Sequence, residues 1–261
     1  MSGAALILSV REVGQGPGPA VVLLHGLFGQ GGNFGAIARG LAGRHRVLAP
    51  DLRNHGSSPH APSMSYPEMA ADLLATLAAR DALPAVLVGH SMGGKVAMAA
   101  AQAAPESIAG LVVADMAPRA YAPSFDRFAA AMQAVPLAPG LTRGAADRAL
   151  AGAVADPAVR AFLVQNLRLE ANPPAWRVNL PAIAAALEEI SAWVPPETPA
   201  YPGPALFIAG ARSDYIRAAD HPAILRRFPA ARFATIEGAG HWIHAEAPER
   251  FLALVEGFLG A

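Results

Sequence analysis

Short apolar runs alternate with longer amphipathic stretches along most of this chain. The runs have the length and the β-branched content of buried strands, and the stretches between them repeat apolar residues at helical spacing. Strands are predicted at Ala5–Val10, Ala20–Leu24, Arg46–Ala49, Ala85–Val88, Leu111–Ala114, Ala205–Ala209 and Arg232–Ile236, and helices at Phe34–Ala42, Tyr66–Ala79, Met92–Ala104, Ala218–Phe228 and Ala247–Leu259. This alternation predicts an α/β fold, with a mostly parallel sheet covered by helices on both faces. Ligands of such sheets bind beyond the carboxyl ends of the strands.

The region from about Arg119 to Pro202 breaks the alternation. It has no strand-like run and closes with a proline-rich segment, Pro195–Pro202. Its amphipathic stretches are Phe125–Ala134, Arg143–Val154, Ala158–Leu169 and Ala175–Trp193. We expect a helical cap, inserted after the sixth strand of an eight-stranded type of sheet and lying over the face that carries the chemistry. The domain prediction is therefore a core of residues 1–118 and 203–261 and a cap of residues 119–202.

Composition excludes several classes of protein. A chain of 261 residues suits one large domain, or one domain with an insertion. Hydrophobic residues make up 53% and charged residues 15%, which excludes a disordered chain. The formal net charge is zero and no basic cluster is present, so nucleic acid and anionic membranes are not expected partners. Because cysteine is absent, disulfides, cysteine-ligated zinc and thiol chemistry are impossible.

We also expect no signal peptide and no membrane span. No apolar run approaches 18 residues, and Met1 to Val13 has neither a basic region nor a long apolar region of a signal peptide. We therefore expect a cytoplasmic protein without a membrane span. Lys95 is the only lysine, and alanine, proline and glycine are abundant, which is typical of a GC-rich bacterial genome.

The most informative segment is Ala85–Met98, in which a strand-like run enters Gly89-His90-Ser91-Met92-Gly93 and then a helix-like stretch. This is the strand–turn–helix context of a nucleophile elbow. A serine hydroxyl needs a base to remove its proton, and a very tight turn makes the hydroxyl accessible to that base. We expect Ser91 to be a catalytic nucleophile. The N–H of Met92 would then point to the place where an oxyanion forms.

Two further segments supply the expected base and a second oxyanion donor. His25-Gly26-Leu27-Phe28-Gly29 follows a predicted strand, and its loop could donate the N–H of Leu27, with His25 ordering the loop. His241 lies in a glycine-flanked loop before the final helix, which suits a general base. His244 lies three residues further on. Without a third ligand nearby, a metal site is disfavoured, and we expect no metal and no cofactor.

The acid that orients His241 has two candidates. The chain order serine, aspartate, histidine leaves room for Asp115, which ends the predicted strand Leu111–Ala114, and for Asp214, which follows Ala205–Ala209. Either aspartate could instead be a turn residue that bonds local backbone N–H groups. The spacing alone leaves both open.

These motifs together resemble the α/β-hydrolase superfamily over essentially the whole chain, and more narrowly its YbfF-type esterases and mitochondrial abhydrolase-domain relatives. The motifs that carry the resemblance are Asp51-Leu52-Arg53-Asn54-His55-Gly56-Ser57-Ser58, Gly89–Lys95, Asp115-Met116-Ala117-Pro118, Trp176-Arg177-Val178-Asn179-Leu180 and Gly240-His241-Trp242-Ile243-His244-Ala245-Glu246. In most members of the superfamily the acid lies three residues after the glycine that ends the seventh strand. That position is Ser213 here, with Asp214 one place late. The YbfF-type relatives use the aspartate after the sixth strand, so the resemblance favours Asp115 and keeps Asp214 as the alternative.

Other conspicuous residues are expected to be structural first. The 51–56 segment should form a turn that braces the elbow, with Asn54 or His55 as possible pocket residues. Lys95, in the first turn of the elbow helix, should brace rather than act as a catalytic amine. Aromatic and methionine side chains could line a substrate pocket for an acyl chain, or could form a small core within the cap: Phe28, Phe125, Phe128, Met132, Phe162, Trp176 and Trp193.

The sequence thus predicts a cofactor-independent serine hydrolase, a carboxylesterase or thioesterase that cleaves short- to medium-chain acyl esters through an acyl-enzyme. Its catalytic residues would be Ser91, His241 and Asp115, or Asp214 in place of Asp115. Perhydrolysis by a cofactor-free haloperoxidase, and acyl transfer to an alcohol, would use the same residues. A ligand-binding member of the fold without turnover is the non-enzymatic alternative. The expected partner is a small acyl ester or thioester; the sequence leaves the oligomeric state open.

Overall fold

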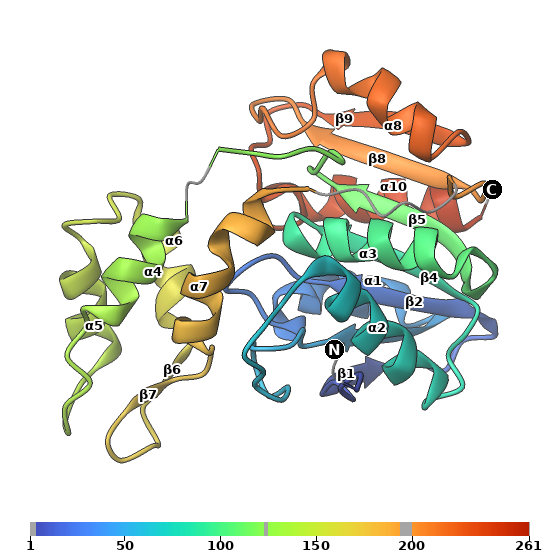
Figure 1. Ribbon diagram of the computed structural model, residues 1–261. Helices are drawn as coiled ribbons and strands as arrows, with labels where there is room; N and C mark the ends of the chain where they lie inside the picture. Colours follow the sequence, from blue (N-terminus) through green and yellow to red (C-terminus); the bar gives the residue numbers. More distant parts are fainter. Residues whose placement is uncertain (1–3, 123–124, 194–199, 261) are drawn as a thin grey trace.

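The computed structural model describes residues 4–122, 125–193 and 200–260. A seven-stranded sheet runs through the core in the order β1-β3-β2-β4-β5-β8-β9 (Figure 1). Only β1 is antiparallel to its neighbour; the other strand pairs are parallel. The strands are β1 (Val10–Val13), β2 (Gly18–Leu24), β3 (His45–Pro50), β4 (Ala85–His90), β5 (Ile108–Ala114), β8 (Ala205–Gly210) and β9 (Ala231–Ile236).

The central strands are buried on both faces, as parallel strands between helices must be. Successive residues of β2 enter different cores: Val22 and Leu24 pack into one, and Val21 and Leu23 into the other. The first core includes residues of α2 (Tyr66–Ala78), α3 (Met92–Ala103) and α8 (His221–Arg227); the second includes residues of α1 (Gly35–Leu41) and α10 (Pro248–Leu259). The predicted α/β class and its mostly parallel sheet are confirmed.

The first strand differs from the prediction. Ala5–Val10 has the composition of a strand, but the strand β1 covers Val10–Val13. Upstream of it, the backbone N–H groups of Leu6 and Leu8 donate to side chains of α2 instead, at Asp72 and Thr76. The described part of the main sheet therefore has seven strands rather than eight, and the cap segment follows β5, the fifth of them.

The segment between β5 and β8 forms a separate layer beside the sheet (Figure 1). It contains α4 (Asp126–Gln133), α5 (Arg143–Leu150), α6 (Pro157–Val164) and α7 (Leu180–Ser191). It also contains two short strands, β6 (Leu167–Arg168) and β7 (Ala175–Trp176), which pair antiparallel. The expectation of a strandless cap is therefore wrong. The helices predicted at Ala158–Leu169 and Ala175–Trp193 are shorter than their amphipathic stretches.

A local reason for the late start of α7 is its cap. The Asn179 side chain accepts the N–H of Ala182, and Pro181 occupies the first turn, where its missing N–H costs nothing. The proline-rich segment expected to close the cap lies mainly in residues 194–199, outside the described residues. The predicted boundaries at residues 118/119 and 202/203 stay a prediction.

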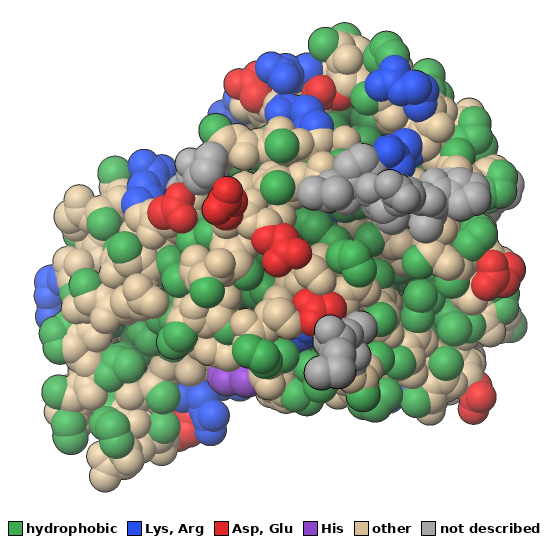
Figure 2. Space-filling model, viewed as in Figure 1, with side chains coloured by type: hydrophobic (Ala, Val, Ile, Leu, Met, Phe, Trp, Pro, Cys, Tyr) green, Lys and Arg blue, Asp and Glu red, His purple; other side chains and the backbone are tan. Residues whose placement is uncertain are grey.

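The surface agrees with the balanced composition. On the face drawn in Figure 2, acidic and basic side chains lie in small separate groups, with apolar side chains scattered between them. No helix among the described residues is both long enough and apolar enough to cross a membrane.

Candidate active site

Ser91 occupies a sharp turn between β4 and α3. Its φ angle of 53° lies in the left-handed region, which costs free energy for a residue with a side chain. The turn is tightly packed, because a Cβ added to Gly89 would overlap the Gly93 carbonyl, and one added to Gly93 would overlap the carbonyl of Leu24. The N–H of Ser91 donates to the carbonyl of Ala114 at 3.1 Å, which ties the turn to β5. The strand–turn–helix geometry predicted for the elbow is present.

Asp115 follows β5, the strand next to β4, and also has a positive φ of 51°. Its side chain is fully buried, and Oδ2 lies 2.7 Å from Nδ1 of His241. Two further donors hold the carboxylate: the N–H of Gly210 at 3.1 Å from Oδ1, and the hydroxyl of Ser213 on Oδ2. Three groups therefore fix the carboxylate: the last residue of β8, a residue of the loop after β8, and His241 after β9.

His241 is positioned by its own neighbours as well. Its ring stacks on Tyr215, with centroids 3.9 Å apart and planes inclined by 20°. Its backbone carbonyl lies 2.9 Å from Nε2 of His90, the residue before Ser91. Because Asp115 occupies Nδ1, Nε2 is the ring nitrogen left for proton exchange with a nucleophile or substrate. Ser91 and His241 line the same cavity.

Asp214, the alternative acid, lies differently. It is exposed, and its backbone carbonyl accepts a hydrogen bond from the Arg119 guanidinium at 2.9 Å. Its neighbour Ser213 is the residue of this loop that contacts the Asp115 carboxylate. The geometry therefore favours Asp115 as the partner of His241.

The proposed oxyanion donors lie on two elements. Met92 begins α3, and the first N–H groups of a helix have no partner within it. Leu27 lies in the loop after β2, where the next amide, of Phe28, donates to Nε2 of His55 at 3.1 Å. The loop is fixed from the cap as well, because the Asn166 side chain donates to the Phe28 carbonyl at 2.8 Å.

Two buried histidines order this loop in their neutral form. His25 accepts the N–H of Leu52 at Nε2, 2.9 Å away, and its Nδ1 lies 2.8 Å from the carbonyl of Gly26. His55 likewise accepts the Phe28 N–H at Nε2 and has Nδ1 2.9 Å from the carbonyl of Arg53. If either ring were protonated, its Nε2–H would point at the backbone N–H of Leu52 or Phe28. Burial, the larger cause, lowers the pKa of His25 to about 4 and that of His55 to about 3.

The turn that contains His55 supports the cap rather than lining the cavity. The Asn54 side chain accepts the N–H of Ala61 at 2.8 Å and the amide of Asn179 at 3.0 Å. The backbone N–H of Asn179 also donates to the Asn54 carbonyl, at 2.9 Å. Neither Asn54 nor His55 is among the residues that line the cavity around Ser91. Asn54 and His55 are therefore structural residues, and Asn54 holds the cap to the core through Asn179.

We call the cavity shared by Ser91 and His241 the aromatic cavity. Its apolar lining comes from the oxyanion loop, Phe125, α4, α6 and the segment after β9. The predicted pocket residues on it are Phe28, Phe125, Phe128 and Phe162. Trp176 is not among the lining residues, contrary to the prediction, because it lies on β7 and its indole N–H donates to the Met132 carbonyl. Met132 and Trp193 are buried in the core and also do not line it.

A metal site finds no support at His241 and His244. Within residues 4–122, 125–193 and 200–260, no group of three or more histidine, aspartate or glutamate side chains could hold a metal ion. The His244 ring stacks on Phe34 instead, with centroids 4.6 Å apart, and burial lowers its pKa to about 4.

Sequence reasoning missed three residues of the site: His90, Ser213 and Tyr215. Each contacts Asp115 or His241: His90 lies beside Ser91 in the chain, and Ser213 and Tyr215 flank Asp214, the alternative acid. One signal was available for Ser213, since it occupies the position where most superfamily members carry the acid. The stacking of Tyr215 has no comparable sequence signal.

Comparison with known proteins agrees with this geometry. A model of the alpha/beta hydrolase family matches residues 21–254. The chain is 42% identical to the sn-1-specific diacylglycerol lipase ABHD11 of Xenopus tropicalis, covering 94% of this chain and 79% of that protein. It is 39% identical to the esterase YbfF of Escherichia coli (strain K12), covering 92% of each. A solved marine microorganism esterase superposes with a TM-score of 0.93 at 35% identity, covering 97% of this chain and all of the other.

The chain therefore belongs to the alpha/beta hydrolase family. Within that family it is an enzyme of the esterase and lipase type.

Proposed function

We propose that this protein hydrolyses acyl esters through a Ser91–His241–Asp115 triad and an acyl-enzyme. His241 takes the proton of the Ser91 hydroxyl, whose oxygen then attacks the acyl carbon. The N–H groups of Met92 and Leu27 stabilise the oxyanion, and the imidazolium gives its proton to the leaving alcohol or thiol. Water activated by His241 then releases the carboxylic acid and regenerates the Ser91 hydroxyl. Asp115 holds the His241 tautomer and stabilises its cation without taking the proton.

The observation that carries this proposal is the 2.7 Å contact between Asp115 and Nδ1 of His241, beside a cavity that also contains Ser91. The proposed nucleophile, acid and base must lie close together. Ser91, Asp115 and His241 follow β4, β5 and β9 at the carboxyl end of the sheet, which supports the proposal. A buried carboxylate behind an imidazole is the arrangement that makes a neighbouring serine a usable nucleophile.

The apolar lining of the aromatic cavity supports esters with a hydrocarbon arm. The similar proteins named above are esterases and a lipase, so we propose carboxylic esters as the substrate class, with short to medium acyl chains. Thioesters would use the same atoms, since only the leaving group changes.

Labelling with a fluorophosphonate, which traps an activated serine, tests the proposal directly. We expect the wild-type protein and the control Ser57→Ala, at an exposed serine, to be labelled and to hydrolyse p-nitrophenyl acetate. Ser91→Ala should lose both, with turnover lower by about three to six orders of magnitude. Substantial turnover in a folded Ser91→Ala protein would refute the serine mechanism. Acceptor alcohols or hydrogen peroxide in the assay would reveal acyl transfer or perhydrolysis by the same residues.

A further inference from the structure

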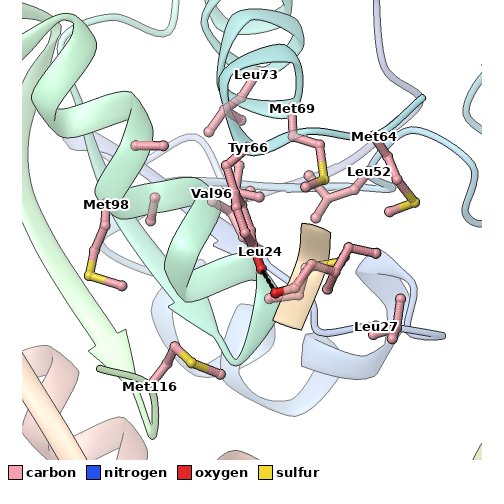
Figure 3. Close-up of a cluster of buried hydrophobic side chains, with 14 of the residues drawn as sticks. Leu24, Leu27, Leu52, Met64, Tyr66, Met69, Leu73, Val96, Met98 and Met116 are labelled. Atoms are coloured by element: carbon pink, nitrogen blue, oxygen red, sulfur yellow. Dashed lines mark hydrogen bonds between the residues drawn. The ribbon is translucent and has the colours of Figure 1, made fainter. Parts of the chain in front are cut away.

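Ser91 borders a second cavity, which we call the lysine cavity. It shares Leu27, Ser91 and Phe125 with the aromatic cavity. The remaining lining is different: it includes Met92, Lys95, Met116 and Tyr121, but not His241. Figure 3 draws Tyr66, another lining residue, in the same cluster of buried side chains as Leu27 and Met116, with its hydroxyl in a hydrogen bond. The nucleophile is therefore the junction of two cavities.

Lys95 forms a fixed wall of the lysine cavity. It lies one helical turn after Ser91 on α3, and its ammonium is 3.2 Å from each of the carbonyls of Ile190, Ser191 and Ala192. These carbonyls end α7, where the helix has no internal donors for them. Burial, and secondarily the charge of Arg119, lowers the pKa of Lys95 to about 7, and the three carbonyls favour its charged form. With three acceptors for its three donors, Lys95 serves as a wall and not as a ligand for substrate.

Other bonds brace the same wall. The Tyr66 hydroxyl donates to the carbonyl of Ile190 at 2.7 Å, and the backbone N–H of Tyr121 donates to that of Ser191 at 3.0 Å. The rings of Tyr66 and Tyr121 flank the ammonium, with centroids 5.4 and 5.0 Å away. The end of the lysine cavity therefore cannot recede without breaking several buried polar contacts. This end of the cavity is therefore a fixed wall that limits length in its own direction, whereas the exposed Ala122 lines the cavity elsewhere.

The aromatic cavity has a different end. Val159, Phe162 and Trp242 line both this cavity and an open cleft of about 870 Å³ between α6 and the segment after His241. The rings of Phe162 and Trp242 have centroids 6.5 Å apart, and both belong to the lining of the two spaces. This packed ring pair separates the aromatic cavity from the cleft, so the far end of the cavity is formed by two side chains and not by a network of polar bonds.

The proton path tells which arm of an ester enters which cavity. His241 must reach the leaving oxygen to protonate it, so the alcohol arm departs from the acyl carbon on the His241 side. Only the aromatic cavity of the two has His241 in its lining. The acyl substituent lies on the other side of the same carbon, where the lysine cavity reaches Ser91 and both oxyanion donors.

We propose, on the basis of the function proposed above, that the lysine cavity is the acyl subsite and that the aromatic cavity holds the alcohol or thiol arm. The preferred substrates are then esters of short acids with large apolar alcohols or thiols. Met116, Tyr121 and the Lys95 wall set the acyl length, whereas the cap aromatics Phe128 and Phe162 act on the leaving group. The cap aromatics were expected from the sequence to line an acyl pocket, and this assignment gives them the other arm.

Two crossed ester series test the assignment. One series varies the acyl group from acetate to dodecanoate with p-nitrophenol as the alcohol, and the other varies the alcohol from ethyl to dodecyl with acetate as the acid, followed by acid release. Met116→Ala enlarges the lysine cavity, and Phe162→Ala is the matched control that enlarges the aromatic cavity. We expect Met116→Ala to raise kcat/KM for octanoate relative to acetate by about tenfold or more and to leave the alcohol profile unchanged. Phe162→Ala should alter the alcohol profile alone.

A filling variant covers the case in which Met116→Ala does not fold. Ala122 is exposed and lines the lysine cavity, so Ala122→Leu narrows it with little strain; kcat/KM for butanoate and longer chains should fall about tenfold relative to acetate. The assignment is wrong if Phe162→Ala moves the acyl profile, if the lysine-cavity variants move the alcohol profile, or if folded variants move neither. Failure of the proposed function looks different: the wild-type protein would hydrolyse neither series and Ser91 would resist fluorophosphonate, and the assignment would fall with it.

Discussion

The carboxyl end of the sheet and the cap differ in the contacts that hold their functional residues. At the carboxyl end of the sheet, backbone groups of β5 and β8 hold Ser91 and Asp115, each at 3.1 Å. His241 is held by side chains, with the Asp115 carboxylate 2.7 Å from its Nδ1 and the His90 imidazole 2.9 Å from its carbonyl. The cap contributes apolar side chains, and polar bonds tie it to the core at separate points, among them Asn166 on the oxyanion loop and Asn179 on the 51–56 turn. The sheet thus holds the candidate catalytic residues, and the cap adds apolar side chains to the cavities beside them. Changes at the carboxyl end of the sheet should alter rate by orders of magnitude, and changes in the cap should alter it by small factors.

The largest effect is expected at the base. His241→Ala should lower kcat by about three to six orders of magnitude, comparable to Ser91→Ala, because nucleophile and base act as one unit. Steady-state kcat of the purified variant, with circular dichroism to confirm that it is folded, measures this loss. Substantial turnover in folded His241→Ala would indicate another base.

The two candidate acids should differ sharply. Asp115→Asn should cost about four orders of magnitude in kcat, since an amide beside Nδ1 no longer holds the reactive tautomer. Asp214→Asn is the matched control and should change kcat less than about threefold, because this exposed side chain lies outside the contacts of His241. Measured kcat values in the reverse order would move the acid to the loop after β8. Similar small losses in both would mean that each aspartate substitutes for the other.

Acid should weaken the fold through the buried neutral histidines. Burial lowers the pKa values of His25, His55 and His244 to about 4, 3 and 4. Between about pH 6.5 and 4 these histidines are therefore protonated in the unfolded chain and neutral in the folded chain. The free energy of unfolding should fall on acidification by about 1.4 kcal/mol per pH unit for each such residue. Urea unfolding at pH 7, 6 and 5 measures this slope.

His55→Gln should make the slope of unfolding free energy against pH smaller by about 1.4 kcal/mol per pH unit. The control His60→Gln, at an exposed histidine, should leave this slope unchanged. Equal slopes in His55→Gln and the wild-type protein would show that His55 gains a proton in the folded state.

The smallest effect is expected where the cap touches the oxyanion loop. Asn166→Ala removes the donor to the Phe28 carbonyl, so the loop that carries Leu27 should be less fixed and kcat should fall about three- to tenfold with KM little changed. Asn179→Ala removes the side-chain bond between the cap and Asn54 instead. Because this bond is not made to the loop that carries Leu27, kcat should stay within about twofold of wild type. If the two variants lose kcat equally, the effect comes from general loosening of the cap.

The elements and the elbow could be predicted because local signals define them. Apolar runs of strand length and amphipathic periods give most of the sheet and its helices, and α2 begins at Ser65, whose side chain and Glu68 form a capping box that the sequence shows directly. Ser91 and His241 stand in glycine-rich turns after strands. The pairing of His241 with Asp115 rather than Asp214 agrees with the resemblance, although spacing alone left it open.

The rest depended on contacts between distant residues. β1 lies later than its hydrophobic run because Asp72 and Thr76, on α2, take the amides of residues 6 and 8. β6 and β7 are only two residues long, so they carry no periodic signal. Lys95 could be expected to brace, but its partners are carbonyls 95 to 97 residues away, at the end of a helix whose start depends on Asn179. Side-chain pairing over such separations leaves no pattern in one sequence.

The positive φ of Ser91 lowers the stability of the folded state while it presents the hydroxyl proposed as the nucleophile to the cavities. Glycine adopts that conformation freely, whereas a residue with a side chain in it costs about 1 kcal/mol or more. A Ser91→Gly protein would thus be inactive and yet fold at least as firmly. Stability alone therefore does not favour a serine at this position, which agrees with the role proposed for it.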